Sequence, residues 1–163
     1  MTHDIKQLIP KHLVGQARIL AIGRLSKPKE TEEETQETIE SSLAVAREHI
    51  KNIYKGPMIL TQLAEQESGL IADRATILEA EELIATGEID LVIAEDLSRI
   101  YRSPRHQYVF VDDCVDSDVR VICVADRLDT SEEDWESAMD MASFRHSFPI
   151  NDCRRRQKRK STV

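Results

Sequence analysis

Short apolar runs alternate along this sequence with longer stretches of helical periodicity. The runs over residues 18–22, 58–60, 89–94 and 119–124 are brief and rich in Ile, Leu and Val, which is typical of buried strands. Parallel neighbours need long crossover connections, and the intervening stretches are long enough to supply helices. The pattern therefore predicts an α/β domain built around a largely parallel sheet.

The first two helical stretches have clear ends. One carries apolar side chains at steps of four and three residues and stops at Gly56-Pro57; its inward positions are Ile39, Leu43, Ala46, Ile50 and Ile53. The acidic block over residues 30–40 favours the start of this helix, because carboxylates are stabilised near the positive end of the helix dipole. The other spans residues 76–86, and Gly87 is expected to end it in the left-handed conformation.

Two more helices are expected in the second half of the chain. Pro104 favours a helix start, and the inward positions expected on that helix are Tyr108, Val111 and Val115. Ser131 is predicted to cap the last helix, whose apolar positions are Trp135, Ala138, Met139 and Ala142. Trp135 has helical spacing with Met139, which favours core packing or a subunit contact over a ligand platform.

Composition narrows the class of protein. The chain has 163 residues, of which 40% are hydrophobic and 32% charged, with five Gly and five Pro. These values predict one globular domain and exclude a collagen, a mucin or a fully disordered chain. The sequence contains no apolar run near the roughly 20 residues of a membrane helix, and its start lacks the order of a secretory signal. We expect a cytoplasmic protein.

The net charge of −8 hides a segregation of sign along the chain. Six of the seven residues in RRRQKRK are basic, namely Arg154, Arg155, Arg156, Lys158, Arg159 and Lys160. Lys and Arg side chains that neutralise DNA phosphates release condensed counterions, so this tail is a candidate DNA-contacting arm. The alternative interpretation is a solvated terminus, which charge runs often form.

Cysteine and histidine spacing offers no metal or disulfide pattern. The three cysteines, Cys114, Cys123 and Cys153, have no CxxC spacing, and the five histidines form no HxH or HExxH motif. Cys123 lies within an apolar run and is predicted to be a buried small hydrophobe. We expect neither a bound metal nor a small-molecule cofactor.

Hydroxyl and guanidinium groups gather after three of the predicted strands. The segments GRLSKPK, QESGLIADR and EDLSRIYR follow these strands, and ligands bind at the carboxyl ends of parallel strands. They supply Arg24, Ser26, Ser68, Asp73, Arg74, Ser98, Arg99 and Arg102. Guanidinium groups pair with phosphate oxygens and balance the charge of a phosphoryl-transfer transition state, which suits attack of a serine on a phosphodiester. Arg and Ser are also common at strand ends without any catalytic role.

Four segments resemble, in order, the motifs of the serine recombinases, the resolvase/invertase family. Residues 21–26 (AIGRLS) resemble the Y-x-R-x-S signature, and residues 68–74 resemble the S-G-x-x-x-D segment with its arginine. EIDLVIAEDLSRIYRS is similar to the strand and turn written D/E-x-L-x-R-x-x-R, and VRVICVADRLDTS to the fourth strand and I-D-T-S turn. The resemblance covers residues 18–146. It implies a three-layer α/β domain with a central, mostly parallel sheet of four or five strands flanked by helices, plus the start of a long C-terminal helix.

The resemblance also implies roles for individual residues. Ser26 matches the nucleophile, which becomes joined to the 5′ end of the cleaved strand, and the arginines that match the active-site set are Arg24, Arg74, Arg99 and Arg102. Supporting positions are Ser68, Asp73, Asp96 and Ser98. Double-stranded DNA is the implied partner, and a homodimer that assembles into a tetramer the implied state. The implied activity is site-specific recombination, which conserves phosphodiester bond energy and needs no cofactor.

Some positions depart from the family pattern. Ser98 stands where an acidic residue often precedes the third arginine, which leaves Asp96 as a substitute, and Ser42 stands where the first helix commonly carries Gln. The resemblance predicts an N-terminal extension over residues 1–16, a catalytic domain over 17–147 and a basic tail over 148–163, with the family's DNA-binding domain absent.

Two other functions compete with this interpretation. One is a catalytically silent oligomerisation or regulatory module derived from a truncated recombinase. The other is a metal-dependent phosphotransfer domain that uses Asp90, Glu95 and Asp96, although Asp90 precedes the predicted strand and Asp96 follows it. Tyr101 lies between two candidate arginines that are expected to share a helical face, and its offset from them predicts a packing role.

Overall fold

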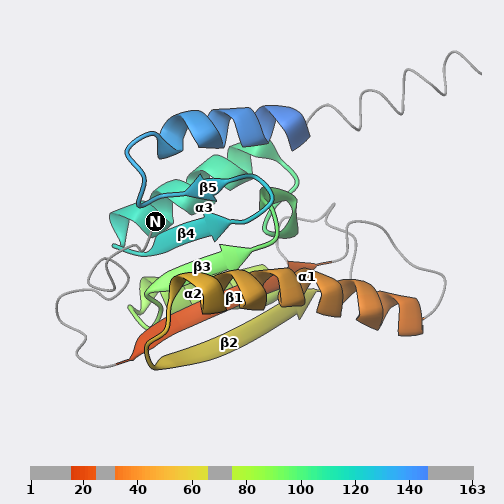
Figure 1. The fold of residues 1–163 in the computed structure, drawn as a ribbon. Helices are drawn as coiled ribbons and strands as arrows, with labels where there is room; N and C mark the ends of the chain where they lie inside the picture. The colour runs from red at the N-terminus through yellow and green to blue at the C-terminus, as the bar shows by residue number, and fades with distance from the viewer. Residues whose placement is uncertain (1–15, 25–31, 66–74, 147–163) are drawn as a thin grey trace, which may run out of the picture.

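A five-stranded sheet runs through the centre of the computed structural model, which describes residues 16–24, 32–65 and 75–146 (Figure 1). The strand order is β2-β1-β3-β4-β5. The strands are β1 (Ala17–Arg24), β2 (Met58–Glu65), β3 (Leu91–Ala94), β4 (Arg120–Cys123) and β5 (Leu128–Asp129). The helices are α1 (Glu32–Ile53), α2 (Ala75–Ala85), the 3-10 turn η2 (Leu97–Arg99) and α3 (Pro104–Asp116), and residues 135–146 are also helical.

The first four strands are parallel and confirm the predicted strand regions. β1 pairs with β2 on one side and with β3 on the other, and β3 pairs with β4. All residues of β3 and β4 are buried, which explains why these strands do not alternate between apolar and polar residues; the one polar residue in them is Arg120, at the start of β4. β5 is a two-residue strand that pairs antiparallel with β4 at the sheet edge.

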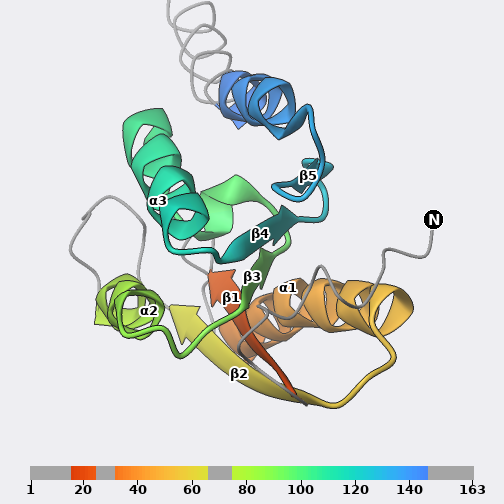
Figure 2. The same ribbon diagram turned by 90° about the vertical axis from the view of Figure 1, so that its left-hand side faces the viewer.

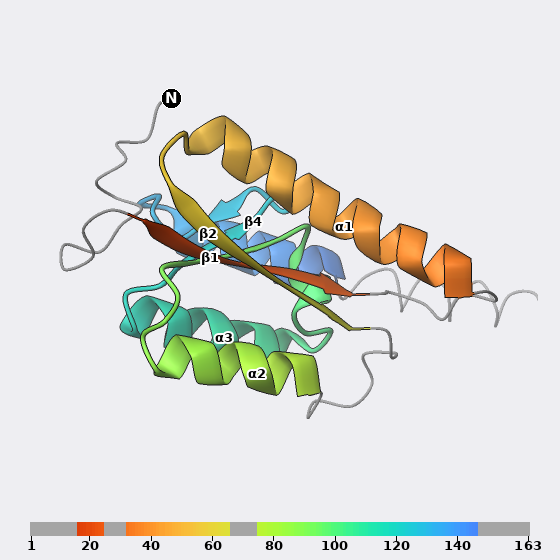
Figure 3. The same ribbon diagram turned by 90° about the horizontal axis from the view of Figure 1, so that it is seen from below.

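Helices cover both faces of the sheet. Figure 3 shows α1 on one face and α2 with α3 on the other. Successive strand residues point to opposite faces, so Ile19 and Ala21 pack in the cluster with α1, whereas Leu20 and Ile22 pack in the cluster with α2 and α3. The helix over residues 135–146 lies beside α3 and adds Met139 and Ala142 to the second cluster (Figure 2). The predicted three-layer α/β fold is confirmed.

The last helix begins later than its sequence suggests. Residues 131–134 form turns, and helical structure starts at Trp135. The Ser131 hydroxyl donates to Asp129 Oδ1 at 2.8 Å. It is therefore bonded to the last residue of β5 and does not cap the helix. The prediction of Ser131 as the cap is therefore wrong. Trp135 is half-buried and packs against the core, in agreement with a packing role.

The buried face of α3 also differs from the expected one. The inward positions are Gln107, Phe110, Val111 and Cys114, whereas Tyr108 and Val115 are only partly buried. At both ends of α3 the buried position is thus one residue earlier than predicted, Gln107 in place of Tyr108 and Cys114 in place of Val115. The cause is Gln107, a polar side chain that is nevertheless 0% exposed.

Two smaller predictions are confirmed. Gly87 has φ +76°, the left-handed conformation expected of the residue that ends α2. Cys123 is fully buried, and this burial raises the pKa of its thiol well above the usual range. Cys153 lies outside the described residues. Within the described part of the chain, the helices are too short or too polar to cross a bilayer.

Candidate active site at the carboxyl edge of the sheet

Three strand ends meet at one edge of the sheet, and the central one leads to Ser26. β1 lies between β2 and β3, with Arg24 in register with Glu65 and Ile22 in register with Ala94. All three strands are parallel, so their carboxyl ends lie at the same edge of the sheet. Ser26 comes two residues after the end of β1, and η2 begins three residues after the end of β3.

The structure describes only part of the predicted site. Ser26, Ser68, Asp73 and Arg74 lie outside the described residues, as do the six basic residues of the tail, Arg154, Arg155, Arg156, Lys158, Arg159 and Lys160. Arg24 is described as the last residue of β1, but its side chain is not described. The side chains of Asp96, Ser98, Arg99 and Arg102 are described, and all of them come from the segment that follows β3.

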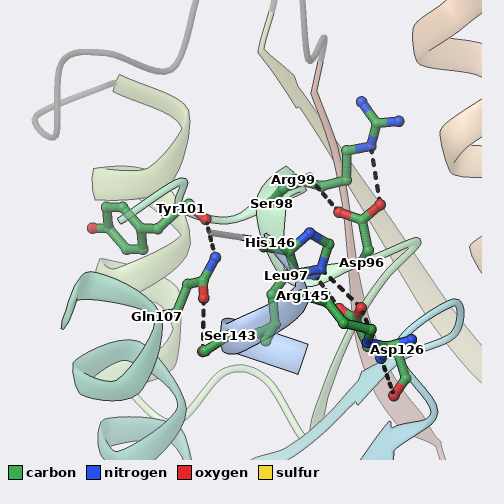
Figure 4. A network of polar contacts seen from close by, with 10 residues as sticks. All are labelled: Asp96, Leu97, Ser98, Arg99, Tyr101, Gln107, Asp126, Ser143, Arg145 and His146. Atoms are coloured by element: carbon green, nitrogen blue, oxygen red, sulfur yellow. Dashed lines mark hydrogen bonds and ion pairs between the residues drawn. The ribbon is translucent and has the colours of Figure 1, made fainter. Parts of the chain in front are cut away.

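Two carboxylates flank the guanidinium of Arg99. Its Nη2 lies 3.2 Å from Glu95 Oε2, and its Nε lies 4.0 Å from Asp96 Oδ2. The Arg99 side chain is 13% exposed, whereas those of Glu95 and Asp96 are 28% and 17% exposed. The Ser98 hydroxyl donates to Asp96 Oδ1, so Ser98 and Arg99 meet on one carboxylate (Figure 4). A guanidinium oriented in this way is suited to binding a phosphate oxygen.

Asp96 thus contacts Arg99, and its role as the substitute acidic residue stays a prediction. Glu95 is a contact that the sequence analysis missed in this role, since it was considered only as a metal ligand. Its spacing of four residues before Arg99 is the signal that could have identified it, because such a pair faces one another on a helical turn.

Arg99 and Arg102 do not share a helical face, contrary to the prediction. η2 ends at Arg99, and α3 begins at Pro104, which leaves Arg102 between the two helical segments. Pro104 disfavours helical backbone at the residue before it, and Ser103 is accordingly extended with φ −76° and ψ 126°. Arg102 is half-buried in this connection.

Tyr101 packs into the core, as predicted, and is not aimed at the site. Its residue is 7% exposed, and its ring stacks on His106 at 5.2 Å between centroids. Its hydroxyl donates to Glu81 Oε1 on α2 at 2.6 Å. Figure 4 shows the ring on the opposite side of the segment from the Arg99 side chain.

Beneath the segment lie two buried polar side chains that the sequence analysis did not identify. Asp126, in the turn after β4, accepts a hydrogen bond from Leu97 N at 2.7 Å. Gln107, on α3, donates from Nε2 to the Tyr101 carbonyl at 2.7 Å. For Gln107 a signal existed, because it is in helical phase with Val111 and Cys114 on a buried face. We find no comparable signal for Asp126.

The carboxylates of the metal-dependent alternative do not converge. Asp90 lies before β3 and accepts hydrogen bonds from Arg18, whereas Glu95 and Asp96 follow the strand at its other end. Among the described residues, no group of three or more His, Cys, Asp and Glu side chains is placed to hold a metal ion. The ligand set that this alternative needs is therefore contradicted by the topology of the sheet.

Comparisons with known proteins agree on one fold. The family model described as the N-terminal domain of resolvase matches residues 20–162. No curated protein matches the sequence significantly. The chain is similar to the crystal structure of the N-terminal catalytic domain of TP901-1 integrase, with a TM-score of 0.61 and 19% identity over 86% of this chain and 98% of that one.

Other solved structures give the same result. A resolvase family site-specific recombinase from Streptococcus pneumoniae matches with a TM-score of 0.58 and 16% identity, over 90% of this chain and 99% of that one. The C-terminal catalytic domain of an IS607-like serine recombinase matches with a TM-score of 0.55 and 17% identity, over 66% of this chain and 70% of that one.

Proposed function

Because the chain belongs to the resolvase N-terminal domain family, whose members recombine DNA at specific sites, we propose that it cleaves and rejoins DNA through a covalent bond to Ser26. Membership of this family implies DNA binding and oligomeric assembly in general. The observation that carries the proposal is the position of β1 between two parallel neighbours, β2 and β3, because Ser26 comes two residues after β1 in the sequence and the candidate arginines follow these same strands.

The reaction exchanges one phosphodiester for another. The Ser26 hydroxyl gives up its proton as its oxygen attacks the phosphorus of the scissile phosphodiester, the deoxyribose 3′ oxygen leaves and takes up one proton, and the 5′ phosphate stays on Ser26. A 3′ hydroxyl then attacks the phosphoserine, which restores the serine hydroxyl and reseals the strand. The number of phosphoester bonds is unchanged, so rejoining needs no external energy source.

Guanidinium groups are the proposed source of transition-state stabilisation. Arg24, Arg74, Arg99 and Arg102 would hold the non-bridging phosphate oxygens and lower the pKa of the Ser26 hydroxyl. Arginine stays protonated at any working pH and offers donors in a planar fork, which matches a phosphate whose negative charge increases during attack. The placement of Arg99 between Glu95 and Asp96 supports this role, since both carboxylates orient the guanidinium.

Two further parts of the chain fit DNA recombination. The basic residues between Arg154 and Lys160 are proposed to contact the phosphate backbone, which gives affinity without sequence information. The helix over residues 135–146 exposes two large apolar side chains, Met141 at 67% and Phe144 at 64%. We propose that this surface contributes to the homodimer and to its assembly into a tetramer.

Covalent trapping tests the proposal. The protein is incubated in EDTA with DNA duplexes that carry a nick or a gap, and adducts are detected by intact mass. We expect a protein–DNA adduct from the wild type and from Ser41→Ala, an exposed serine on α1, and none from Ser26→Ala. An adduct in Ser26→Ala would exclude Ser26 as the nucleophile. Self-association without any adduct would favour the silent oligomerisation module.

A further inference from the structure

The segment that carries Arg99 is held at both ends by buried polar side chains. At its start, Asp126 Oδ2 accepts the hydrogen bond from Leu97 N at 2.7 Å, and Asp126 is 6% exposed. At its end, Gln107 Nε2 donates to the Tyr101 carbonyl at 2.7 Å, and Gln107 is 0% exposed. The backbone over residues 97–101 is thus fixed by two side chains that come from outside it.

Both of these side chains also bond to the helix over residues 135–146. His146 Nε2 lies 2.8 Å from Asp126 Oδ1, and the Ser143 hydroxyl donates to Gln107 Oε1 at 2.9 Å. Figure 4 shows the two chains of contacts running side by side from the last helix to the segment that follows β3. Arg145 adds a weaker contact, with Nη2 3.5 Å from Asp126 Oδ1 and a side chain that is 55% exposed.

Asp126 and Gln107 each use one polar atom for the segment over residues 97–101 and the other for the last helix, so the two contacts of each side chain depend on one another. One Asp126 oxygen faces Leu97 and the other faces His146, so the carboxylate cannot turn towards one partner without losing the other. The Gln107 amide likewise uses its nitrogen for Tyr101 and its oxygen for Ser143. Buried polar groups that lose a partner are destabilised by the full cost of their desolvation, which penalises any independent shift of the helix or the segment.

Apolar contacts join the same two regions. Leu97 and Ile100 are 0% exposed and belong to the same core cluster as Met139 and Ala142 of the last helix. General packing alone would give the two regions a shared core. The polar contacts add directional restraint at the two ends of the segment, on either side of Arg99.

We propose that Asp126 and Gln107 are positioning residues that link the position of Arg99 to the position of the helix over residues 135–146. Asp126 and Gln107 make this link through their hydrogen bonds to His146 and Ser143 of that helix. The consequence for catalysis rests on the proposed function, because it requires Arg99 to bind the scissile phosphate. The link between the position of the helix and the position of the segment does not rest on the proposed function.

Substitutions on the helix test the link in the full chain. His146→Leu removes the donor to Asp126, and His146→Gln restores a donor near the position of Nε2. Ser143→Ala removes the hydroxyl bonded to Gln107, and Ser137→Ala is its matched control, an exposed serine on the same helix. Amide hydrogen exchange is measured over residues 97–101 and, for comparison, in β1 and α1, together with the single-turnover rate of DNA adduct formation.

The link predicts a local effect. Exchange over residues 97–101 should speed up by about three- to tenfold in His146→Leu and Ser143→Ala, the range expected for one buried hydrogen bond. His146→Gln and Ser137→Ala should behave like the wild type. Adduct formation at saturating DNA should slow in the same two variants with DNA affinity unchanged.

Two results would overturn the proposal. One is unchanged exchange over residues 97–101 in both His146→Leu and Ser143→Ala. The other is faster exchange that extends equally to β1 and α1, because that would indicate a general loss of stability. If the wild type itself forms no adduct, the proposed function fails, and the exchange data alone still decide whether the helix positions the segment.

Discussion

The two ends of β3 carry the same chemical groups in different settings. At the amino end, the fully buried Asp90 carboxylate accepts hydrogen bonds from the Arg18 backbone N–H at 2.8 Å and from its guanidinium at 3.2 and 3.4 Å. At the carboxyl end, Arg99 lies between Glu95 and Asp96, which are both partly exposed. Each end thus pairs arginine with carboxylate.

Access to water separates the two roles. A carboxylate without water must be satisfied entirely by the protein, so Arg18 and Asp90 are committed to each other and to the fold. Carboxylates with access to water orient a guanidinium without depending on it, so a phosphate is able to compete for Arg99. The solvent exposure of the carboxylates around an arginine, more than the presence of the arginine, therefore distinguishes a structural ion pair from a candidate phosphate site.

The largest effect is expected from removing the ion pair at the amino end of β3. Arg18→Ala leaves the Asp90 charge buried without its partner, and we expect the free energy of unfolding to fall by roughly 3–5 kcal/mol. Urea denaturation measures this loss. Arg47→Ala is the control, since Arg47 pairs with an exposed Glu40 on α1 and its removal should lower stability by less than about 1 kcal/mol. Equal losses in the two variants would contradict the distinction.

At the other end of β3, the loss should fall on activity. Arg99→Ala is expected to slow adduct formation by about 10²- to 10³-fold, the usual effect of removing one transition-state donor. Its stability should change less than that of Arg18→Ala, because Glu95 and Asp96 already have access to water. Arg99→Lys should recover only part of the rate, since lysine lacks the planar fork. Arg105→Ala, at an exposed position of α3, is the control and should react at the wild-type rate.

Two histidines should give stability opposite responses to pH. The hydrogen bond that His146 donates to the Asp126 carboxylate raises the pKa of His146 above 6.5, so the contribution of His146 to stability is complete below about pH 6.5 and is lost as the pH rises through the raised value. Burial lowers the pKa of His49 below 6.5, so its contribution is complete above that pH and is lost as the pH falls. Thermal unfolding of His146→Gln should decline less than the wild type above neutrality, and His49→Gln should decline less in acid. The same response from both variants would contradict these assignments.

The smallest effect concerns Ser42 on α1. Its hydroxyl is buried and has no hydrogen-bond partner among the residues that the structure describes, and Ser42 is 1% exposed. Ser42→Ala should raise the free energy of unfolding by up to about 1 kcal/mol, because a buried hydroxyl without a partner is destabilising. A loss of stability in urea denaturation would show that the hydroxyl is satisfied in solution.

Apolar patterns predicted most of the fold. The buried strands and the helix that carries Ile39 and Leu43 follow from periodicity, because burial of apolar area dictates both. β5 has two residues and is fixed by its pairing with β4, a contact that periodicity does not encode. The start of the last helix was misplaced because the Ser131 hydroxyl has a competing partner in Asp129.

Parts of the site were less predictable for a related reason. The order of motifs identified the family and singled out Arg99 and Asp96, which the structure places in contact, and their catalytic roles stay predictions. The contacts of Asp126 with Leu97 and His146 join residues that are 29 and 20 positions apart, so only the folded chain brings them together. The prediction that Arg99 and Arg102 share a helical face was wrong because Pro104 begins a new helix after a break.

The identity of the residue that carries DNA tests the central claim most directly. Tryptic peptides of the trapped adduct are mapped by mass spectrometry after nuclease digestion. We predict a nucleotide joined through its 5′ phosphate to Ser26 in the peptide LSKPK, residues 25–29. A nucleotide on another peptide, such as IYR with Tyr101, would contradict the assignment of Ser26 as the nucleophile.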